Sequence, residues 1–166
     1  DKVKDIDRIR ISSIEPNLLT NEIIEFCNSS IKFMPHYHIP LQSGSNKILK
    51  AMRRRYDKKV YKNRIKKIKD TNPDTCIGVD VIVGFPGESK EDFLETYNFL
   101  EELDISYLHV FSYSERPGTD ALKIHNKIQT TDKSQRSKML RILSEKKMRA
   151  FYSQFINKKR PILFEG

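Results

Sequence analysis

The sequence predicts an α/β fold in which about four parallel strands alternate with flanking helices. Three apolar segments each end in polar and glycine residues, and they lie at residues 38–45, 79–88 and 108–119. Stretches with helical periodicity separate these segments. In parallel sheets and βα barrels, the loops after the carboxyl ends of the strands form the ligand site. We therefore expect a ligand to bind at these three loops.

The first half of the chain has recognisable element boundaries. Residues 8–13 alternate polar and apolar side chains, which predicts a strand that ends before Pro16. Asn17 is placed to cap a helix that extends to residue 28. The predicted buried face of that helix consists of Leu18, Leu19, Ile23, Ile24 and Cys27. A second strand is expected at residues 36–42, and Ser45 or Asn46 caps the next helix.

The second half continues the alternation. Asp57 and Ser89 each begin a predicted helix, and a long helix is expected from Thr131 or Asp132 to Asn157. The apolar stripe of the helix after Asp57 consists of Val60, Tyr61, Ile65 and Ile68. That of the helix after Ser89 consists of Phe93, Leu94, Tyr97, Leu100 and Leu103, and that of the long helix of Leu140, Leu143, Phe151 and Phe155. Strands are predicted at residues 76–84 and 107–113. The first is a near-continuous apolar run, which is typical of a strand covered on both faces.

Composition narrows the class of protein. The chain has 166 residues, of which 37% are hydrophobic and 32% charged, enough for one domain with a core. No apolar run approaches the roughly 18 residues that span a bilayer, and no secretory signal opens the chain. Its two cysteines, Cys27 and Cys76, lack metal-like spacing. We expect a cytoplasmic protein with reduced cysteines and no membrane partner.

The net charge of +9 is unevenly distributed. Residues 47–69 carry twelve Lys and Arg against one Asp, and residues 131–160 carry ten against two acidic residues. Residues 70–130 carry four basic and twelve acidic side chains. Two basic blocks around an acidic stretch favour binding of a polyanion, although such blocks can also be solvated helix faces.

Several residues could carry chemistry at the strand ends. Asp80 interrupts an apolar strand, so its carboxylate needs a ligand or a hydrogen-bond network. Gln42 and Ser43 offer an amide and a hydroxyl suited to ribose or an amino acid group, although Ser45 could simply cap a helix there. The segment 84–88 joins a strand to a helix and contains two glycines. It could be a loop that contacts a ligand or a structural tight turn. His36 and His38 share one strand face without a third ligand, so no metal site is predicted.

Five motifs in order along the chain resemble one family. They are residues 8–16 (RIRISSIEP), 38–45 (HIPLQSGS), 48–56 (ILKAMRRRY), 78–88 (GVDVIVGFPGE) and 111–121 (FSYSERPGTDA). Together they are similar to the radical S-adenosylmethionine (SAM) methylthiotransferases, in the C-terminal two-thirds of the radical SAM domain. The resemblance implies a partial radical SAM (βα) barrel. The Ser-Ser-x-Glu-Pro form resembles the branch that modifies threonylcarbamoyladenosine in tRNA.

The resemblance implies roles for particular residues. Positions expected to bind SAM are Ser13, Glu15, Gln42, Ser43, Arg54, Asp80, Ile82, Gly84 and Glu88. Among them, Arg54 is expected to hold the SAM carboxylate, and the 82–88 segment to pack against its adenine. Positions expected to face the tRNA anticodon stem-loop are Tyr113, Arg116, Lys66, Lys67 and Lys69. No catalytic or metal-binding residue is assigned.

The chain departs from the family in its cysteines. The family holds two 4Fe-4S clusters on two sets of three cysteines, which two distant cysteines cannot replace. We therefore expect residues 1–157 to be part of the barrel of a longer enzyme and to be inactive alone. Residues 158–166 are expected to lead into a C-terminal RNA-binding β-domain. The resemblance leaves the sulfur donor unidentified.

Two other hypotheses remain open for the function. The longer protein could modify isopentenyladenosine in tRNA or a ribosomal protein instead. Alternatively, the same fold could serve as an RNA-binding module without chemistry.

Overall fold

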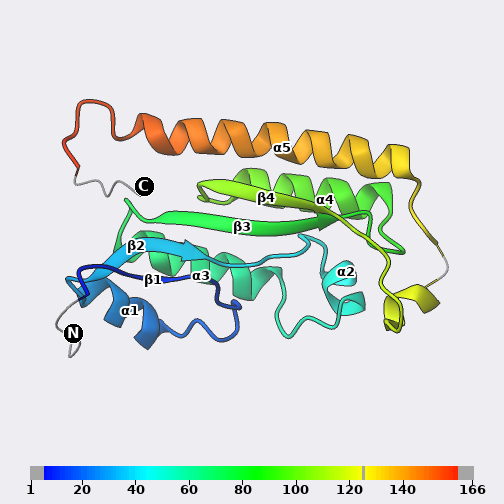
Figure 1. The fold of residues 1–166 in the computed structure, drawn as a ribbon, viewed down its shortest axis with the longest axis horizontal. Helices are drawn as coiled ribbons and strands as arrows, with labels where there is room; N and C mark the ends of the chain where they lie inside the picture. Colours follow the sequence, from blue (N-terminus) through cyan, green and yellow to red (C-terminus); the bar gives the residue numbers. More distant parts are fainter. Residues whose placement is uncertain (1–5, 125, 161–166) are drawn as a thin grey trace.

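Four parallel strands form one sheet in the order β1-β2-β3-β4 (Figure 1). The computed structural model describes residues 6–124 and 126–160. The strands are β1 (Ile9–Ile11), β2 (Phe33–His38), β3 (Cys76–Val83) and β4 (Tyr107–Ser112). The helices are α1 (Asn21–Ser29), α2 (Asn46–Ala51), α3 (Lys58–Thr71), α4 (Lys90–Glu102) and α5 (Thr130–Ser153), with a 3₁₀ helix at Asp120–Lys123. The predicted order and parallel topology are thus confirmed.

The two faces of the sheet differ in what covers them. On β3, Ile77, Val79, Val81 and Val83 are fully buried, whereas the alternate residues Asp80 and Ile82 are half-buried. Helices α3 and α4 lie behind the sheet in Figure 1, and α5 runs beside β4. The prediction that this strand is covered on both faces is therefore wrong for the described residues. We call the uncovered side, to which Asp80 belongs, the open face.

Helix caps explain where most helices begin. The Asp57 side chain accepts from the Val60 N–H at 2.8 Å, and Ser89 forms a capping box with Asp92, both as predicted. Helix α1 instead begins after Thr20, so Leu18 precedes the helix and is 59% exposed. Strand β2 begins and ends earlier than the predicted 36–42, with Pro35 inside the strand and Pro40 beyond its end.

Some predicted core positions are less buried than expected. Leu94 on α4 is 39% exposed, and Phe99 packs in the core there. Phe151 and Phe155 are only half-buried, near the end of α5. Of residues 158–166, which are expected to lead into a C-terminal β-domain, residues 161–166 lie outside the described ranges. No helix in the described ranges is long and apolar enough to cross a membrane.

The loop after β2 is fixed tightly against α4. A Cβ on Gly44 would lie 2.7 Å from the Thr96 Cα, so only glycine fits there. The Gly44 N–H donates to the Thr96 hydroxyl at 3.0 Å, and the Ser45 hydroxyl donates to Asp92 Oδ1 at 2.9 Å. Asp92 also accepts from Lys47 Nζ at 2.6 Å. This packing fixes the position of Gln42 at the carboxyl end of the sheet.

Replacing Asp92 with asparagine is expected to destabilise the protein by about 1–2 kcal/mol at pH 7. Burial raises the Asp92 pKa, but hydrogen bonds from Lys47, Ser89 and Ser45 outweigh burial and lower it from 3.8 to about 2. A carboxyl group whose pKa is lower in the folded state stabilises the fold at pH values above its unfolded-state pKa. This stabilisation is lost as the pH falls toward the folded-state pKa. Urea unfolding of both proteins should therefore show the difference shrinking between pH 4 and about 2. A difference that stays constant over that range would contradict this role.

Candidate active site at the carboxyl edge of the sheet

A cleft of about 420 Å³ opens where β3 and β4 end. Its walls are Gln42, Asp80, Ile82, Phe111, Ser112, Tyr113, Ser114, Arg116, Thr119 and Ala121. Five of these were predicted as site residues: Gln42, Asp80, Ile82, Tyr113 and Arg116. They come from strand β3 and from the segments that follow β2 and β4, which the parallel topology brings to one edge. The cleft therefore lies where the strand pattern predicts a ligand.

A second hollow, of about 460 Å³, adjoins the first and shares Ile82, Tyr113, Thr119 and Ala121 with it. Arg54 lines this second hollow. Its Nη1 donates to Glu15 Oε1 at 3.0 Å, so Glu15 holds the guanidinium at this edge. The Arg54 Nε is buried and has no hydrogen-bond partner among the described residues. The arrangement leaves a buried N–H donor for an anionic ligand.

Gln42 has a strained backbone. Its φ is 68°, in the left-handed region that residues other than glycine rarely adopt. Its N–H donates to the Asp80 carbonyl at 2.9 Å, and its carbonyl accepts from the Ile82 N–H at 2.9 Å. Hydrogen bonds on both sides thus hold Gln42 in a costly conformation with its side chain on the cleft wall. Such strain concentrates at functional sites.

The loop from Gly84 to Glu88 is fixed from inside the protein. The Glu88 side chain is 1% exposed and accepts from the Gly84 N–H at 2.7 Å and from Arg136 Nη1. Burial raises the pKa of Glu88, and these two donors oppose that rise. Gly84 has a φ of +74°, and a Cβ there would meet the Lys133 side chain at 2.4 Å. Glu88 therefore points inward and fixes the loop against α5, outside the cleft lining.

Several other predicted residues do not line the cleft. The Ser43 hydroxyl is buried against Thr96, and Ser13 is exposed after β1. On α3, Lys66 pairs with Asp70 at 2.6 Å and Lys67 with Glu25 at 2.8 Å. The remaining predicted RNA contact, Lys69, is 9% exposed and donates to the Pro73 carbonyl at 3.2 Å. Because its ammonium is used inside the fold, we leave Lys69 out of the proposed RNA contacts.

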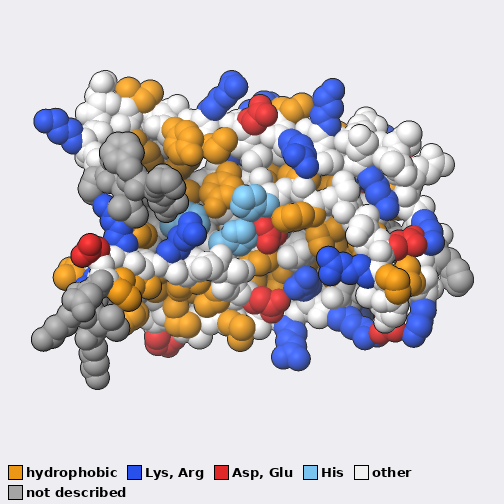
Figure 2. Space-filling view, in the orientation of Figure 1, with side chains coloured by type: hydrophobic (Ala, Val, Ile, Leu, Met, Phe, Trp, Pro, Cys, Tyr) orange, Lys and Arg blue, Asp and Glu red, His pale blue; other side chains and the backbone are white. Residues whose placement is uncertain are grey.

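The sequence interpretation missed His109, which lies on the open face. Its ring stacks on that of His38 at a centroid distance of 5.3 Å, and His38 Nε2 is 2.8 Å from Asp80 Oδ1. Figure 2 shows histidine side chains gathered near the centre of this face. The alternation Tyr107, His109, Phe111 along one strand was the signal that could have revealed it.

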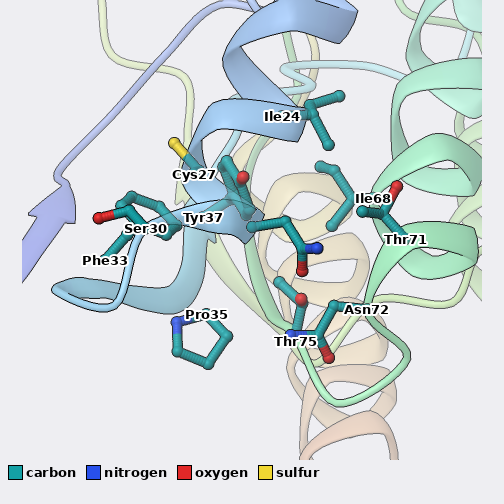
Figure 3. Close-up of a pocket in the computed structure, with 11 residues that line it drawn as sticks. Ile24, Cys27, Ser30, Phe33, Pro35, Tyr37, Ile68, Thr71, Asn72 and Thr75 are labelled. Atoms are coloured by element: carbon teal, nitrogen blue, oxygen red, sulfur yellow. The ribbon is translucent and has the colours of Figure 1, made fainter.

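Another hollow, of about 210 Å³, lies at the opposite end of the sheet between α1, β2 and α3 (Figure 3). Ile24, Cys27, Tyr37 and Ile68 line it together with Asn and Thr side chains. None of the predicted site residues is among its lining residues. Since ligands of parallel sheets bind at the carboxyl edge, this hollow is not the candidate site.

Comparisons with known proteins identify the family of this chain. The sequence profile described as the radical SAM superfamily matches residues 2–100. The chain is 44% identical over 164 residues to a Bacillus subtilis protein named threonylcarbamoyladenosine tRNA methylthiotransferase MtaB, covering 99% of this chain and 36% of that protein. It is 38% identical over 164 residues to a Zymomonas mobilis protein named tRNA-2-methylthio-N(6)-dimethylallyladenosine synthase, covering 99% and 37%.

A further relative and one solved structure extend the comparison. An Aquifex aeolicus protein also named MtaB is 43% identical over 153 residues, covering 92% of this chain and 37% of that protein. The chain thus spans about a third of the length of these relatives. The radical SAM enzyme coproporphyrinogen III oxidase (HemN) of Escherichia coli shares the fold, with a TM-score of 0.63, 18% identity and coverage of 89% of this chain and 32% of HemN.

Proposed function

Because the chain belongs to the radical SAM superfamily, in the family of the methylthiotransferases, we propose that it forms part of the SAM and substrate site of a tRNA methylthiotransferase. The observation that carries the proposal is the 44% identity over 99% of this chain to a protein named as a tRNA methylthiotransferase, and the cleft at the carboxyl edge of the sheet is consistent with it. We propose threonylcarbamoyladenosine as the substrate nucleoside. The proteins at 44% and 43% identity carry that substrate in their names, and dimethylallyladenosine synthases follow at 38%.

The residues around the cleft fit the chemical groups of SAM. The buried Arg54 Nε, which has no partner in the described part of the chain, suits the carboxylate of the methionyl group. Asp80 and Gln42 offer acceptors and an amide for an ammonium or for ribose hydroxyls, and Ile82 offers an apolar surface for adenine. Bound SAM would supply a deoxyadenosyl radical for hydrogen abstraction. The role of this chain would be to bind and orient it.

The cysteines of this chain do not fit an iron–sulfur cluster. Cys27 lies on the buried side of α1, and Cys76 lies at the amino end of β3. Burial raises the pKa of both thiols, which opposes the thiolate form that iron requires. We therefore propose that the cluster ligands, for two 4Fe-4S clusters, belong to other parts of a longer protein. We also propose that the part of the radical SAM barrel in this chain ends at residue 157.

The test of radical chemistry uses the full-length protein. After anaerobic reconstitution with iron and sulfide, it is incubated with SAM, a reductant and tRNA. We expect release of 5′-deoxyadenosine that increases when tRNA is added. No release from protein whose clusters are present would support the alternative, an RNA-binding module without chemistry.

The proposed partner is the anticodon stem-loop of tRNA. Arg116 lines the cleft, is exposed, and makes no ion pair among the described residues, so it is available for a phosphate. Tyr113, half-buried beside Lys133, offers a ring on which a base could stack. Lys66 and Lys67 are exposed or partly exposed on α3, but carboxylates already neutralise them. We expect Arg116 to contribute more to RNA binding than these lysines.

Replacing Arg116 with alanine in the full-length protein is expected to weaken tRNA binding and lower the slope of log K against log salt by about 0.7–0.9. The slope reflects the counterions that phosphates release on binding, and a phosphate that Arg116 no longer neutralises keeps its counterion. The control is the double variant Lys66→Ala and Lys67→Ala, which should change the slope less. Filter binding over a range of salt concentrations measures both. A larger slope change in the double variant would instead place the RNA on α3.

A further inference from the structure

Three neighbouring strands each place one metal-binding side chain on the open face. They are His38 on β2, Asp80 on β3 and His109 on β4. The register pairs Asp80 with His109 directly, and His38 pairs with Gly78, two residues before Asp80. Because the side chains of a strand alternate between faces, all three point to the same side of the sheet. The strand register alone therefore brings them together.

The ligand atoms of the three residues are close together. They all lie within 4.8 Å of one another, and His38 Nε2 lies 2.8 Å from Asp80 Oδ1. Asp80 Oδ1 is buried, and within the described ranges it has no hydrogen-bond partner, so the His38 ring is its close polar neighbour. No Lys or Arg among the described residues forms an ion pair with Asp80. The half-buried carboxylate is thus paired only with a histidine ring in the described part of the chain, and it keeps the capacity to bind a cation.

Neighbouring groups restrict the movement of these side chains. The Tyr107 ring packs edge-on against His109 at a centroid distance of 5.1 Å, and its hydroxyl hydrogen-bonds His36 Nε2 at 2.9 Å. The Asp80 carbonyl accepts from the N–H groups of Leu41 and Gln42 at 3.1 and 2.9 Å. Such supporting contacts orient metal ligands and raise affinity. The Tyr107 hydroxyl occupies Nε2 of His36, and His36 lies outside the group of close ligand atoms, which leaves His38 and His109 as the imidazoles of the cluster.

We propose that His38, Asp80 and His109 bind one divalent transition-metal ion, for which Zn²⁺ is the probe. Two imidazole nitrogens and one carboxylate oxygen are a ligand set of zinc and iron(II) sites that keep a position open. Metal–ligand bonds of about 2.0–2.2 Å require the three atoms to approach more closely than they do here. His109 is exposed and can make that movement. The open position would face the uncovered side of the sheet.

The experiment measures metal binding without SAM or tRNA, so its outcome is independent of the proposed function. The 166-residue protein, without a histidine tag, is titrated with Zn²⁺ by calorimetry and with Co²⁺ by visible absorption. We expect saturation at one ion per chain and ligand-field bands from bound Co²⁺. His109→Gln and Asp80→Asn should each weaken binding by about 10–100-fold. His36→Ala is the matched control, because it removes an imidazole from the same face outside the cluster.

The outcomes separate a specific site from scattered histidine binding. Absence of a saturable site in the wild-type protein would overturn the proposal. It would also be overturned if His109→Gln bound Zn²⁺ as tightly as wild type, or if His36→Ala weakened binding as much as His109→Gln. Circular dichroism of each variant verifies that it is folded. Since His109 is exposed, its replacement is expected to leave the fold intact.

Discussion

Replacing Arg136 with methionine is expected to destabilise the protein by about 3–5 kcal/mol at pH 8. The Glu88 side chain is 1% exposed, and Arg136 is the cation that pairs with it. Without the guanidinium, the carboxylate would keep only the Gly84 N–H, while its Oε1 already lacks a partner in the described part of the chain. A buried charge without a counter-charge is strongly destabilising. Urea unfolding monitored by circular dichroism measures the loss.

The pH dependence distinguishes this mechanism from simple loss of packing. Burial already raises the Glu88 pKa, and removal of Arg136 should raise it further. When the folded-state pKa of a carboxyl exceeds the unfolded value, the folded state binds more protons and stability falls as pH rises. The loss in Arg136→Met should therefore be smaller at pH 5 than at pH 8. An equal loss at both pH values would show that only packing against Phe93 matters.

Two further variants complete the test. Adding Glu88→Gln to Arg136→Met removes the unpaired charge, so the double variant should be more stable than Arg136→Met alone. Arg141→Met is the matched control, since Arg141 is exposed one turn further along α5. Its effect should stay within about 0.5 kcal/mol. A similarly small effect of Arg136→Met would contradict a role for the ion pair in holding the loop from Gly84 to Glu88.

Replacing Gln42 with glycine is expected to lower the methylthiolation activity of the full-length protein by about 10–100-fold with little change in stability. Glycine tolerates the φ of 68° without strain, which offsets its own entropic cost of about 0.5–1 kcal/mol. The amide that this change removes lies on the cleft wall, where it would position SAM or the nucleoside. Initial rates and urea unfolding, measured on the same preparations, separate the two effects.

The control for backbone strain is Asn157→Gly. Asn157 also has a positive φ, of 64°, but lies beyond α5 and outside the cleft lining. Its replacement should leave activity unchanged. A loss of stability in Gln42→Gly that matches its loss of activity would mean that Gln42 acts on the fold alone.

Much of this fold follows from local sequence signals. Asp57 and Ser89 mark helix starts because a short acceptor side chain precedes an apolar stripe, and both caps occur as predicted. The start of α1 was misjudged because Asn17 and Thr20 are equally good cap residues, and tertiary contacts select between them. Coverage of β3 was misjudged because a run of β-branched residues does not reveal which face has a partner.

The candidate site was predictable only where residues lie near or just after the carboxyl ends of strands. Gln42, Asp80 and Tyr113 follow from the parallel topology, which places strand ends at one edge. Glu88 lies in the same motif, yet its side chain turns inward because Arg136, 48 residues later, pairs with it. The pairing of His109 with Asp80 depends on strand register. Contacts of that kind need the folded structure, since no local pattern encodes them.

The central claim is that this chain contributes to a tRNA methylthiotransferase acting on threonylcarbamoyladenosine. The most direct measurement uses the full-length protein, reconstituted anaerobically and supplied with SAM, reductant and tRNA that carries threonylcarbamoyladenosine. Digested nucleosides are then analysed by mass spectrometry. The account predicts a methylthio group on threonylcarbamoyladenosine and none on isopentenyladenosine in a parallel tRNA. The reverse pattern, or no methylthio product from protein with intact clusters, would contradict it.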